Sequence, residues 1–483
     1  MKPDDLFSAN ELYQWVTTQA AFGQRRPGSP AGKTNETYLF NQLVGFGLKD
    51  VRLEPTEVSY WEPHQWSFKV GNRSFDAFGI PHTTFTSPQG LSAPLVYGRS
   101  NDFFAGTSWK GKIVVAEIEF PSIDNALLQR LALGTFDPED TLKSVTHPAT
   151  WIRLGWHIYQ WAMKRGAAGF VGILKNQPGG TSHMYAPYGF KEKNILDKKI
   201  PGLWIGRDEG ADLLSLAKTG AVAHLTLAGR ATPAISHNIV AEIPGQTSET
   251  IVLSCHHDSP FTSPVEDGTG VSVILALAKH FAKGPAPLRR IVILLTAGHF
   301  YGSIGTRTFI AKHRRETVAR TVLEISVEHI ALEAIENAAG KLVPSGLPEA
   351  VGMFVPFSRA LTALILRLLI AHDLKRCLLL PPEGPLGDYP PTDGGDWYQA
   401  GVPVINYISN PVYLLTDDDA LQWVDRQRLA TVATFFVRLV EQLDHLTSRE
   451  IGANGFRIRK FFMRLLKHLV KCKTTWAGLK PVH

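Results

Sequence analysis

Residues 251–306 constrain the fold most strongly, because they alternate buried-strand and helix patterns and carry polar residues at the strand ends. Two apolar runs, one at the start and one towards the end of this segment, flank a helical pattern. Short continuous apolar runs are typical of strands buried on both faces of a parallel sheet. His256, His257 and Asp258 directly follow the first run, and His299 follows the second. Because open α/β sheets carry their sites beyond the carboxyl ends of the strands, we predict an α/β fold with a site there.

Later segments extend the same pattern. A third apolar run at 322–327 ends in Glu328 and His329, and a further strand is expected at 402–408. Three successive strands therefore end in a histidine or a glutamate. This repetition strengthens the prediction of one site, since a single such residue occurs on many protein surfaces.

The sequence patterns divide the chain into four parts. Residues 92–229 consist of short alternating elements with glycines where strands begin, which predicts a smaller α/β domain inserted into a larger one. Residues 1–91 and 230–450 then form the larger domain, and the second of these stretches carries the site. Residues 451–483 form a separate basic tail.

The composition excludes several classes of protein. With 483 residues, of which 44% are apolar and 19% charged, the chain can form a sizeable core. Three cysteines are too few for a disulfide framework or a cysteine-rich metal site. The N-terminus lacks an apolar signal region, and no apolar run is long enough to span a membrane. We therefore expect a soluble cytoplasmic protein.

The chemistry of the predicted strand ends is that of metal ligands. The sequence contains no Gly-x-Ser-x-Gly elbow and no glycine-rich phosphate loop after a strand. Imidazole and carboxylate groups are common ligands of Zn, Mn and Fe. The candidates near the strand ends are His256, His257, Asp258, Glu266, Asp267, His299, Glu328 and His329.

Residues 457–473 predict a basic amphipathic helix. Its apolar residues recur at helical spacing, its basic residues lie largely elsewhere, and no acidic residue follows Glu450. Such a helix suits an anionic surface, either a membrane or a nucleic acid. The alternative is that its apolar face docks on the same chain or on a second subunit, giving a homodimer.

Four motifs together resemble those of a known family. Residues 25–30 resemble an Arg-x-x-Gly-Ser motif, and His256-His257-Asp258 matches His-x-Asp. Residues 266–270 resemble Asp-Asp-x-Ser-Gly, and residues 401–403 resemble Gly-Ile-Pro. In order and spacing these are the motifs of the co-catalytic zinc exopeptidases, a family of aminopeptidases and glutamate carboxypeptidases that includes glutaminyl cyclases and the non-catalytic transferrin receptor.

The resemblance covers nearly all of residues 15–445 and carries expectations about the fold. It implies a mixed, mostly parallel sheet flanked by helices. Residues 92–229 are similar to the protease-associated domain that some members carry as an insertion. The resemblance implies that this domain folds over the site.

The departures from the family pattern concern the metal ligands. The family holds two metals with five protein ligands. The first, second and fourth ligands fall on His256, Glu266 and Glu328, which can all coordinate a metal. The third and fifth fall on Phe300 and Leu415, which cannot. The resemblance therefore implies one divalent metal at most, either Zn, Mn or Fe, with the second metal site lost.

The resemblance also assigns catalytic roles. The general base of the family falls on His299, and an imidazole is suited to acid/base work near neutral pH. Asp258 corresponds to the residue that orients the first histidine. The additional candidates for the site are His257, Asp267, His329 and Asp393.

Three functions follow from these residues. The first is a mononuclear metal-dependent hydrolase or transferase that acts on an amide of a small peptide or amino-acid derivative. The second is a binding protein on an inactive peptidase scaffold, in which His299 and Glu328 pair with each other. The third is a surface-anchored protein whose function lies in the basic tail.

Overall fold

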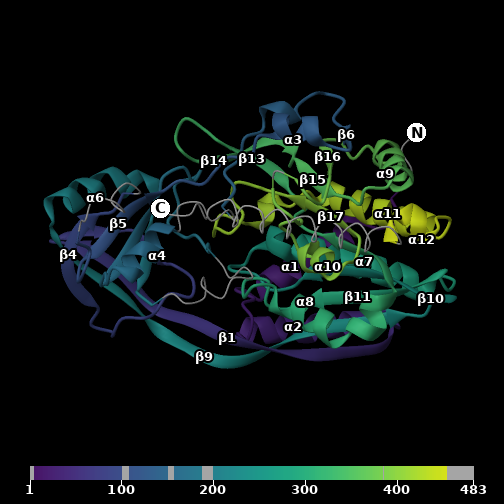
Figure 1. Ribbon diagram of the computed structural model, residues 1–483, viewed down its shortest axis with the longest axis horizontal. Helices are drawn as coiled ribbons and strands as arrows, with labels where there is room; N and C mark the ends of the chain where they lie inside the picture. Colours follow the sequence, from purple (N-terminus) through teal and green to yellow (C-terminus); the bar gives the residue numbers. More distant parts are fainter. Residues whose placement is uncertain (1–4, 100–107, 151–156, 188–198, 385, 454–483) are drawn as a thin grey trace, which may run out of the picture.

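The computed structural model describes residues 5–99, 108–150, 157–187, 199–384 and 386–453. Its main sheet is mixed and mostly parallel (Figure 1). The strand order is β9 (Val222–Ile243), β11 (Arg289–Thr296), β10 (Thr247–His256), β12 (Thr321–Val327), β17 (Val404–Ser409), β15 (Val351–Phe354), β16 (Cys377–Leu380) and β6 (Gly134–Phe136). The α/β prediction with a mixed, mostly parallel sheet is confirmed.

The apolar runs of the sequence form the centre of this sheet. β10 pairs in parallel with both β11 and β12, and β12 pairs in parallel with β17. His256 lies opposite Thr296, and Ser254 lies opposite Ser326. The carboxyl ends of the three strands are therefore level with one another at one edge of the sheet.

Helices cover both faces of the main sheet. Side chains alternate along a strand, so a continuous apolar run presents apolar side chains to both faces. On one face, Ile251 and Leu253 lie in the same core cluster as residues of α1 (Ala9–Ala21), α7 (Gly270–Lys283), α9 (Arg359–Ala371) and α11 (Arg426–Leu443). On the other face, Val252 packs with Phe309 of α8 (Ile304–Lys312) and Trp397 of α10 (Gly394–Ala400). The remaining helices of this part are α2 (Pro30–Gly45) and α12 (Ser448–Ile451). No helix in the described ranges is long and apolar enough to cross a membrane.

A long two-stranded ribbon joins the main sheet to a second group of strands. β1 (Lys49–Val70) and β9 pair antiparallel along nearly their whole length, and the ribbon runs along one side of the molecule (Figure 1). Beyond it lie β3 (Ala77–Gly79), β8 (Gly202–Ile205), β7 (Gly169–Leu174), β5 (Ile113–Ile118) and β4 (Leu91–Tyr97). β2 (Arg73–Phe75), α4 (His157–Lys164) and α6 (Arg207–Thr219) complete this group, which we call the inserted unit.

The edges of the inserted unit differ from the predicted range 92–229. β3 pairs with β8 and therefore belongs to the unit, although it begins at Ala77. At the other edge, β9 passes through Gly229 without interruption and continues into the main sheet. The reason is that one pair of long strands, β1 and β9, runs through both groups of strands. A loop at residues 80–90 precedes β4, whereas the predicted boundary after Gly229 falls inside a strand.

Residues 121–149 extend from the inserted unit to the edge of the main sheet. We call this segment the crossover arm. Its two ends are joined by hydrogen bonds between residues 123 and 147 and between residues 121 and 149. Between these ends, β6 pairs with β16, and α3 (Asn125–Leu131) lies against β16. The arm thus carries residues of the predicted insertion to the edge of the main sheet, an arrangement that no pattern in the sequence indicates.

Two further strands and several short turns complete the described chain. β13 (Leu332–Glu336) and β14 (Leu342–Pro348) form a separate two-stranded sheet. The short helical turns are Leu142–Ser144, Pro264–Thr269, Arg314–Val318 and Leu421–Trp423. The basic helix predicted at 457–473 lies outside the described residues.

Candidate metal and catalytic site

The strand ends bring a cluster of buried titratable residues together. His256 is the last residue of β10, and Glu328 and His329 follow β12. His299 follows β11, and Glu266 lies in the turn that precedes α7. All five are at most 7% exposed. Parallel pairing of the three strands accounts for their meeting, as the sequence pattern predicts.

His256 and His329 are held in the same way. Nδ1 of His256 lies 3.0 Å from the carbonyl oxygen of Asp258, and Nδ1 of His329 lies 2.8 Å from that of Ser409. A carbonyl oxygen only accepts, so both rings donate from Nδ1. Each ring therefore presents Nε2 on its other side, which is the usual arrangement of a metal-binding histidine.

The two Nε2 atoms converge on the carboxylate of Glu266. Nε2 of His256 lies 3.2 Å from Oε1, and Nε2 of His329 lies 2.7 Å from Oε2. Among the described residues, neither Nε2 atom nor Oε2 has a partner with hydrogen-bond geometry. Buried polar atoms seldom lack partners. This convergence is what a bound cation would satisfy.

The charged groups of the site also favour a cation at this position. Burial lowers the pKa of His329, but the Glu266 carboxylate outweighs it and raises the pKa to about 10. Burial raises the pKa of Glu266, but the His329 and His256 imidazoles outweigh it and bring the pKa below the usual range. The Glu266 carboxylate thus favours positive charge at this position. Either two imidazolium rings or a bound divalent cation would supply that charge.

The residues present form two overlapping groups of ligands. In the first, ligand atoms of His256, Asp267, Glu328 and His329 all lie within 4.8 Å of one another. In the second, those of His256, Glu266 and His299 do so. The predicted ligands His256, Glu266 and Glu328 are thus spread over both groups. His329, only an additional candidate in the sequence analysis, contacts Glu266 directly.

Asp267 supports the backbone of the site. Its Oδ1 accepts hydrogen bonds from the backbone N–H groups of Gly270, at 3.1 Å, and of His329, at 3.2 Å. Its Oδ2 lies 3.1 Å from Sγ of Cys255. Asp267 therefore fixes the start of α7 and the position of His329, rather than pointing both oxygens at one ligand.

Asp393 holds the ring of His299. Its Oδ1 lies 2.8 Å from Nδ1 of His299, and the His299 ring stacks on His256 at a centroid distance of 4.1 Å. Burial raises the pKa of Asp393, but the His256 and His299 imidazoles outweigh it and lower the pKa. Glu328 instead accepts a hydrogen bond of 3.3 Å from the Asp393 backbone. Asp393 is thus the hydrogen-bond partner of His299 at Nδ1, and a pairing of His299 with Glu328 in an inactive site stays a prediction.

Asp258 and His257 have different surroundings. The Asp258 carboxylate accepts from the backbone N–H groups of His299, at 3.2 Å, and Phe300, at 3.5 Å, while its carbonyl orients His256. His257 faces away, with Nε2 2.9 Å from the carbonyl oxygen of His237. The structure thus brings Asp258 into the site and separates His257 from both ligand groups. Alternation of side chains at the end of β10 is the physical reason.

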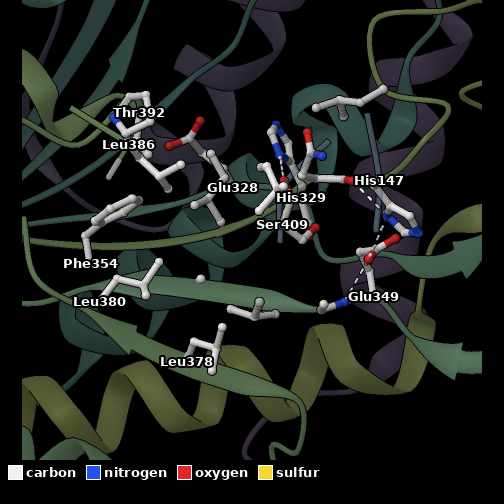
Figure 2. Close-up of a pocket in the computed structure, with 18 of the residues that line it drawn as sticks. His147, Glu328, His329, Glu349, Phe354, Leu378, Leu380, Leu386, Thr392 and Ser409 are labelled. Atoms are coloured by element: carbon white, nitrogen blue, oxygen red, sulfur yellow. Dashed lines mark hydrogen bonds and ion pairs between the residues drawn. The ribbon is translucent and has the colours of Figure 1, made fainter. Parts of the chain in front are cut away.

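The cluster opens into a pocket of about 100 Å³, enough for several water molecules (Figure 2). Glu266, His299, Glu328 and His329 line its reactive part. The apolar lining includes Leu128, Val351, Phe354, Leu378, Leu380 and Leu386. His147 and Glu349 lie at another end (Figure 2). This lining could not be predicted from the sequence, because the crossover arm supplies Leu128 and His147 and no motif marks either of them.

The comparisons with known proteins agree with the geometry. Residues 238–340 match the model of Peptidase family M28. Carboxypeptidase Q of Xenopus laevis is 24% identical over 404 residues, which cover 79% of this chain and 73% of that protein. BSAP, a zinc aminopeptidase from Bacillus subtilis, has a TM-score of 0.67 at 16% identity, covering 92% of this chain and 98% of that chain. The Peptidase M28 precursor from Shewanella amazonensis SB2B has a TM-score of 0.67 at 19% identity, covering 90% of this chain and 93% of that chain. The resemblance to the co-catalytic zinc exopeptidases is confirmed.

In this zinc-exopeptidase fold, Phe300 and Leu415 stand where the resemblance places two ligands of the second metal. Both side chains are only 1% exposed. Phe300 makes edge contacts with the rings of His256 and Tyr185, at centroid distances of 5.7 and 5.6 Å. Apolar side chains thus occupy both positions.

The inserted unit contacts the loop that carries Leu415 and Asp417, which we call the site loop. The backbone N–H of Tyr185 donates to the Leu415 carbonyl at 2.8 Å. Nδ1 of His183 lies 2.6 Å from Oδ2 of Asp417. The unit is therefore fastened to the loop that carries Leu415 by a backbone hydrogen bond and an ion pair.

Proposed function

We propose that this protein is a mononuclear metal-dependent hydrolase or transferase of the zinc-exopeptidase family. Its substrate is an amide of a small peptide or an amino-acid derivative. The observation that carries the proposal is the convergence of Nε2 of His256 and Nε2 of His329 on Glu266, with both Nδ1 atoms bound to backbone carbonyls. Such rings are poised to coordinate, whereas a purely structural histidine normally has both nitrogens satisfied.

The donor set of the site fits one divalent cation. His256, Glu266 and His329 would hold it, and Glu328 lies within the same ligand group as both histidines. Imidazole with carboxylate suits Zn, Mn or Fe. When bound, the cation would polarise the carbonyl of the amide. Phe300 and Leu415 offer no ligand for a second ion, which supports a single metal.

His299 is the residue that moves the proton. With Nδ1 bound to Asp393, its Nε2 is the nitrogen that accepts a proton from the attacking water. The water oxygen then forms a bond to the carbonyl carbon, the C–N bond breaks, and His299 returns the proton to the leaving amine. Asp393 keeps the ring in the required tautomer and orientation.

The pocket and the inserted unit supply binding and closure. The apolar lining formed by Phe354, Leu378 and Leu380 binds a side chain of the substrate. Tyr185, whose backbone is held on the Leu415 carbonyl, packs edge-on against Phe300, which in turn contacts His256, and this packing excludes bulk water from that side of the site.

Metal analysis combined with an activity screen tests this proposal. The purified protein is expected to contain about one equivalent of divalent metal and to hydrolyse at least one aminoacyl amide. A Glu328→Gln variant should fold normally and lose the activity. Metal-free protein without turnover, even after incubation with Zn²⁺, Mn²⁺ or Fe²⁺, would refute the proposal.

A binding protein without turnover is the second candidate. The apolar filling by Phe300 and Leu415 favours it, because a scaffold that has lost its second metal has lost part of the family's catalytic apparatus. In that case amino-acid amides would bind with full affinity and be recovered unchanged.

A further inference from the structure

The pocket has an acidic end that the proposed reaction does not use. Glu349 and His147 lie at this end, and Figure 2 shows His329 and Ser409 between them and Glu328. Glu349 precedes β15, and His147 comes from the crossover arm. Two segments that are distant in the sequence thus build this end of the pocket.

Glu349 is a buried carboxylate with an incomplete set of partners. Its side chain is 2% exposed. Oε1 accepts a hydrogen bond of 2.8 Å from the backbone N–H of Ala350, whereas Oε2 is buried and has no hydrogen-bond partner among the described residues. Burying a carboxylate oxygen without a donor costs free energy. A ligand that brings a donor would recover that cost.

The neighbouring groups do not provide this donor. Nδ1 of His147 lies 3.3 Å from the Asn410 carbonyl oxygen, to which it donates, and 3.5 Å from Oε1 of Glu349. The nearby Arg376 guanidinium is bound to Glu333 at 2.7 Å and to the Pro348 carbonyl at 2.7 Å. Carbonyl and carboxylate oxygens therefore predominate at this end, which favours a cationic ligand group.

The ligand group is an organic ammonium rather than a metal ion. His147, Glu333 and Glu349 have ligand atoms within 4.8 Å of one another, as a metal site would. However, Arg376 already neutralises Glu333, so only one carboxylate is left to balance a ligand's charge, which is too few for a divalent ion. A monovalent ammonium matches the single charge of Glu349.

We propose that Glu349 and the Asn410 carbonyl bind a protonated amine at the end of the substrate's side chain. The substrate class is then an amide of a basic amino acid of the lysine type. An α-amino group lies next to the reacting carbonyl and so stays near His299. The group that reaches Glu349 is remote from it, and Val351 and Leu378 line the pocket for the methylene stem. This inference rests on the proposed function for the identity of the substrate.

Equilibrium binding of L-lysine and L-norleucine tests the inference, because the two differ only in the terminal amine. A charge-assisted hydrogen bond in a buried site predicts at least about tenfold tighter binding of lysine. The Glu349→Gln variant should lose this preference while binding norleucine normally. Glu119→Gln is the matched control, since this glutamate has a side chain that is 62% exposed and lies outside the pocket.

The outcomes separate this inference from the proposed reaction. Equal binding of both amino acids by the wild-type protein, or no binding of either, would overturn the inference whether or not the variant folds. Hydrolysis of norleucinamide and lysinamide at equal efficiency would keep the proposed function and overturn the inference. Lysine binding that depends on Glu349, without hydrolysis of lysinamide, would keep the inference and refute the hydrolase.

Discussion

Glu266→Gln is the substitution that tests the centre of the site most directly. It keeps the size of the side chain and removes its charge. Glu266 is 2% exposed and lies 3.2 Å from Nε2 of His256 and 2.7 Å from Nε2 of His329. Without metal, the variant leaves two buried imidazoles without the carboxylate between them. With metal, it removes a charged ligand.

The expected magnitude follows from the burial and from the pKa of His329. Removing one partner of a buried ion pair costs about 3–5 kcal/mol. The pKa of His329 is raised to about 10, so releasing its proton at pH 7 costs at most about 4 kcal/mol. The two values agree. We therefore expect the free energy of unfolding of the chelator-treated variant to fall by about 3–5 kcal/mol, with metal affinity reduced by at least about 100-fold.

Urea unfolding followed by tryptophan fluorescence, with metal content measured by mass spectrometry, provides the assay. Glu36→Gln is the matched control, because Glu36 is also a buried carboxylate bound to a histidine, His237, at 2.8 Å. The control should lose stability and keep its metal. A Glu266→Gln protein with unchanged stability and unchanged metal content would show that this carboxylate neither balances the histidines nor binds a metal.

Three other predictions follow from the same structure. Asp393→Asn removes the acceptor that orients His299, so kcat for the amide substrate should fall by at least about 100-fold with little change in KM. A change in KM with an unchanged kcat would contradict this role. The pair of substitutions Phe300→Glu and Leu415→His supplies the two missing ligands, and metal content should rise from about one to about two equivalents per chain; an unchanged stoichiometry would argue against those positions. His183 donates to a partly exposed aspartate of the site loop, a hydrogen bond that raises the pKa of its imidazole. The pair should therefore stabilise the contact between the inserted unit and the site loop by roughly 0.5 kcal/mol below the unfolded pKa of about 6.5. This stabilisation should be lost as the pH rises through the raised pKa. Amide hydrogen exchange of the site loop, followed against pH, should show this change in the wild-type protein and not in His183→Gln.

Several expectations from the sequence stay predictions. They are the protease-associated character of the inserted unit, the cytoplasmic location, a homodimer, and an anionic partner for the tail at 457–473. The tail lies outside the described residues, so its function as a surface anchor stays a prediction as well.

The position of the site could be read from the sequence because it depends on local patterns. Apolar runs of strand length specify buried parallel strands wherever they occur. His256, His299 and Glu328 follow such runs, so their meeting at one edge of the sheet required only that the strands be neighbours. The motif around Glu266 placed the next element over the same edge.

The tertiary structure decided which of these residues act together. The partner of His299 is Asp393, 94 positions later in the chain. His329 joins Glu266 because its Nδ1 is held by the Ser409 carbonyl of a neighbouring strand, which no local pattern specifies.

The shape of the pocket was decided in the same way. The crossover arm brings His147 from the inserted unit to Glu349 at the edge of the main sheet. Strand patterns determine where a chain is buried, whereas the direction of a side chain at the end of a strand depends on packing against segments that are far away in the sequence. The sequence by itself therefore determined the sheet and the edge that bears the site, and only the packing of distant segments decided the hydrogen-bond partners and the lining of the pocket.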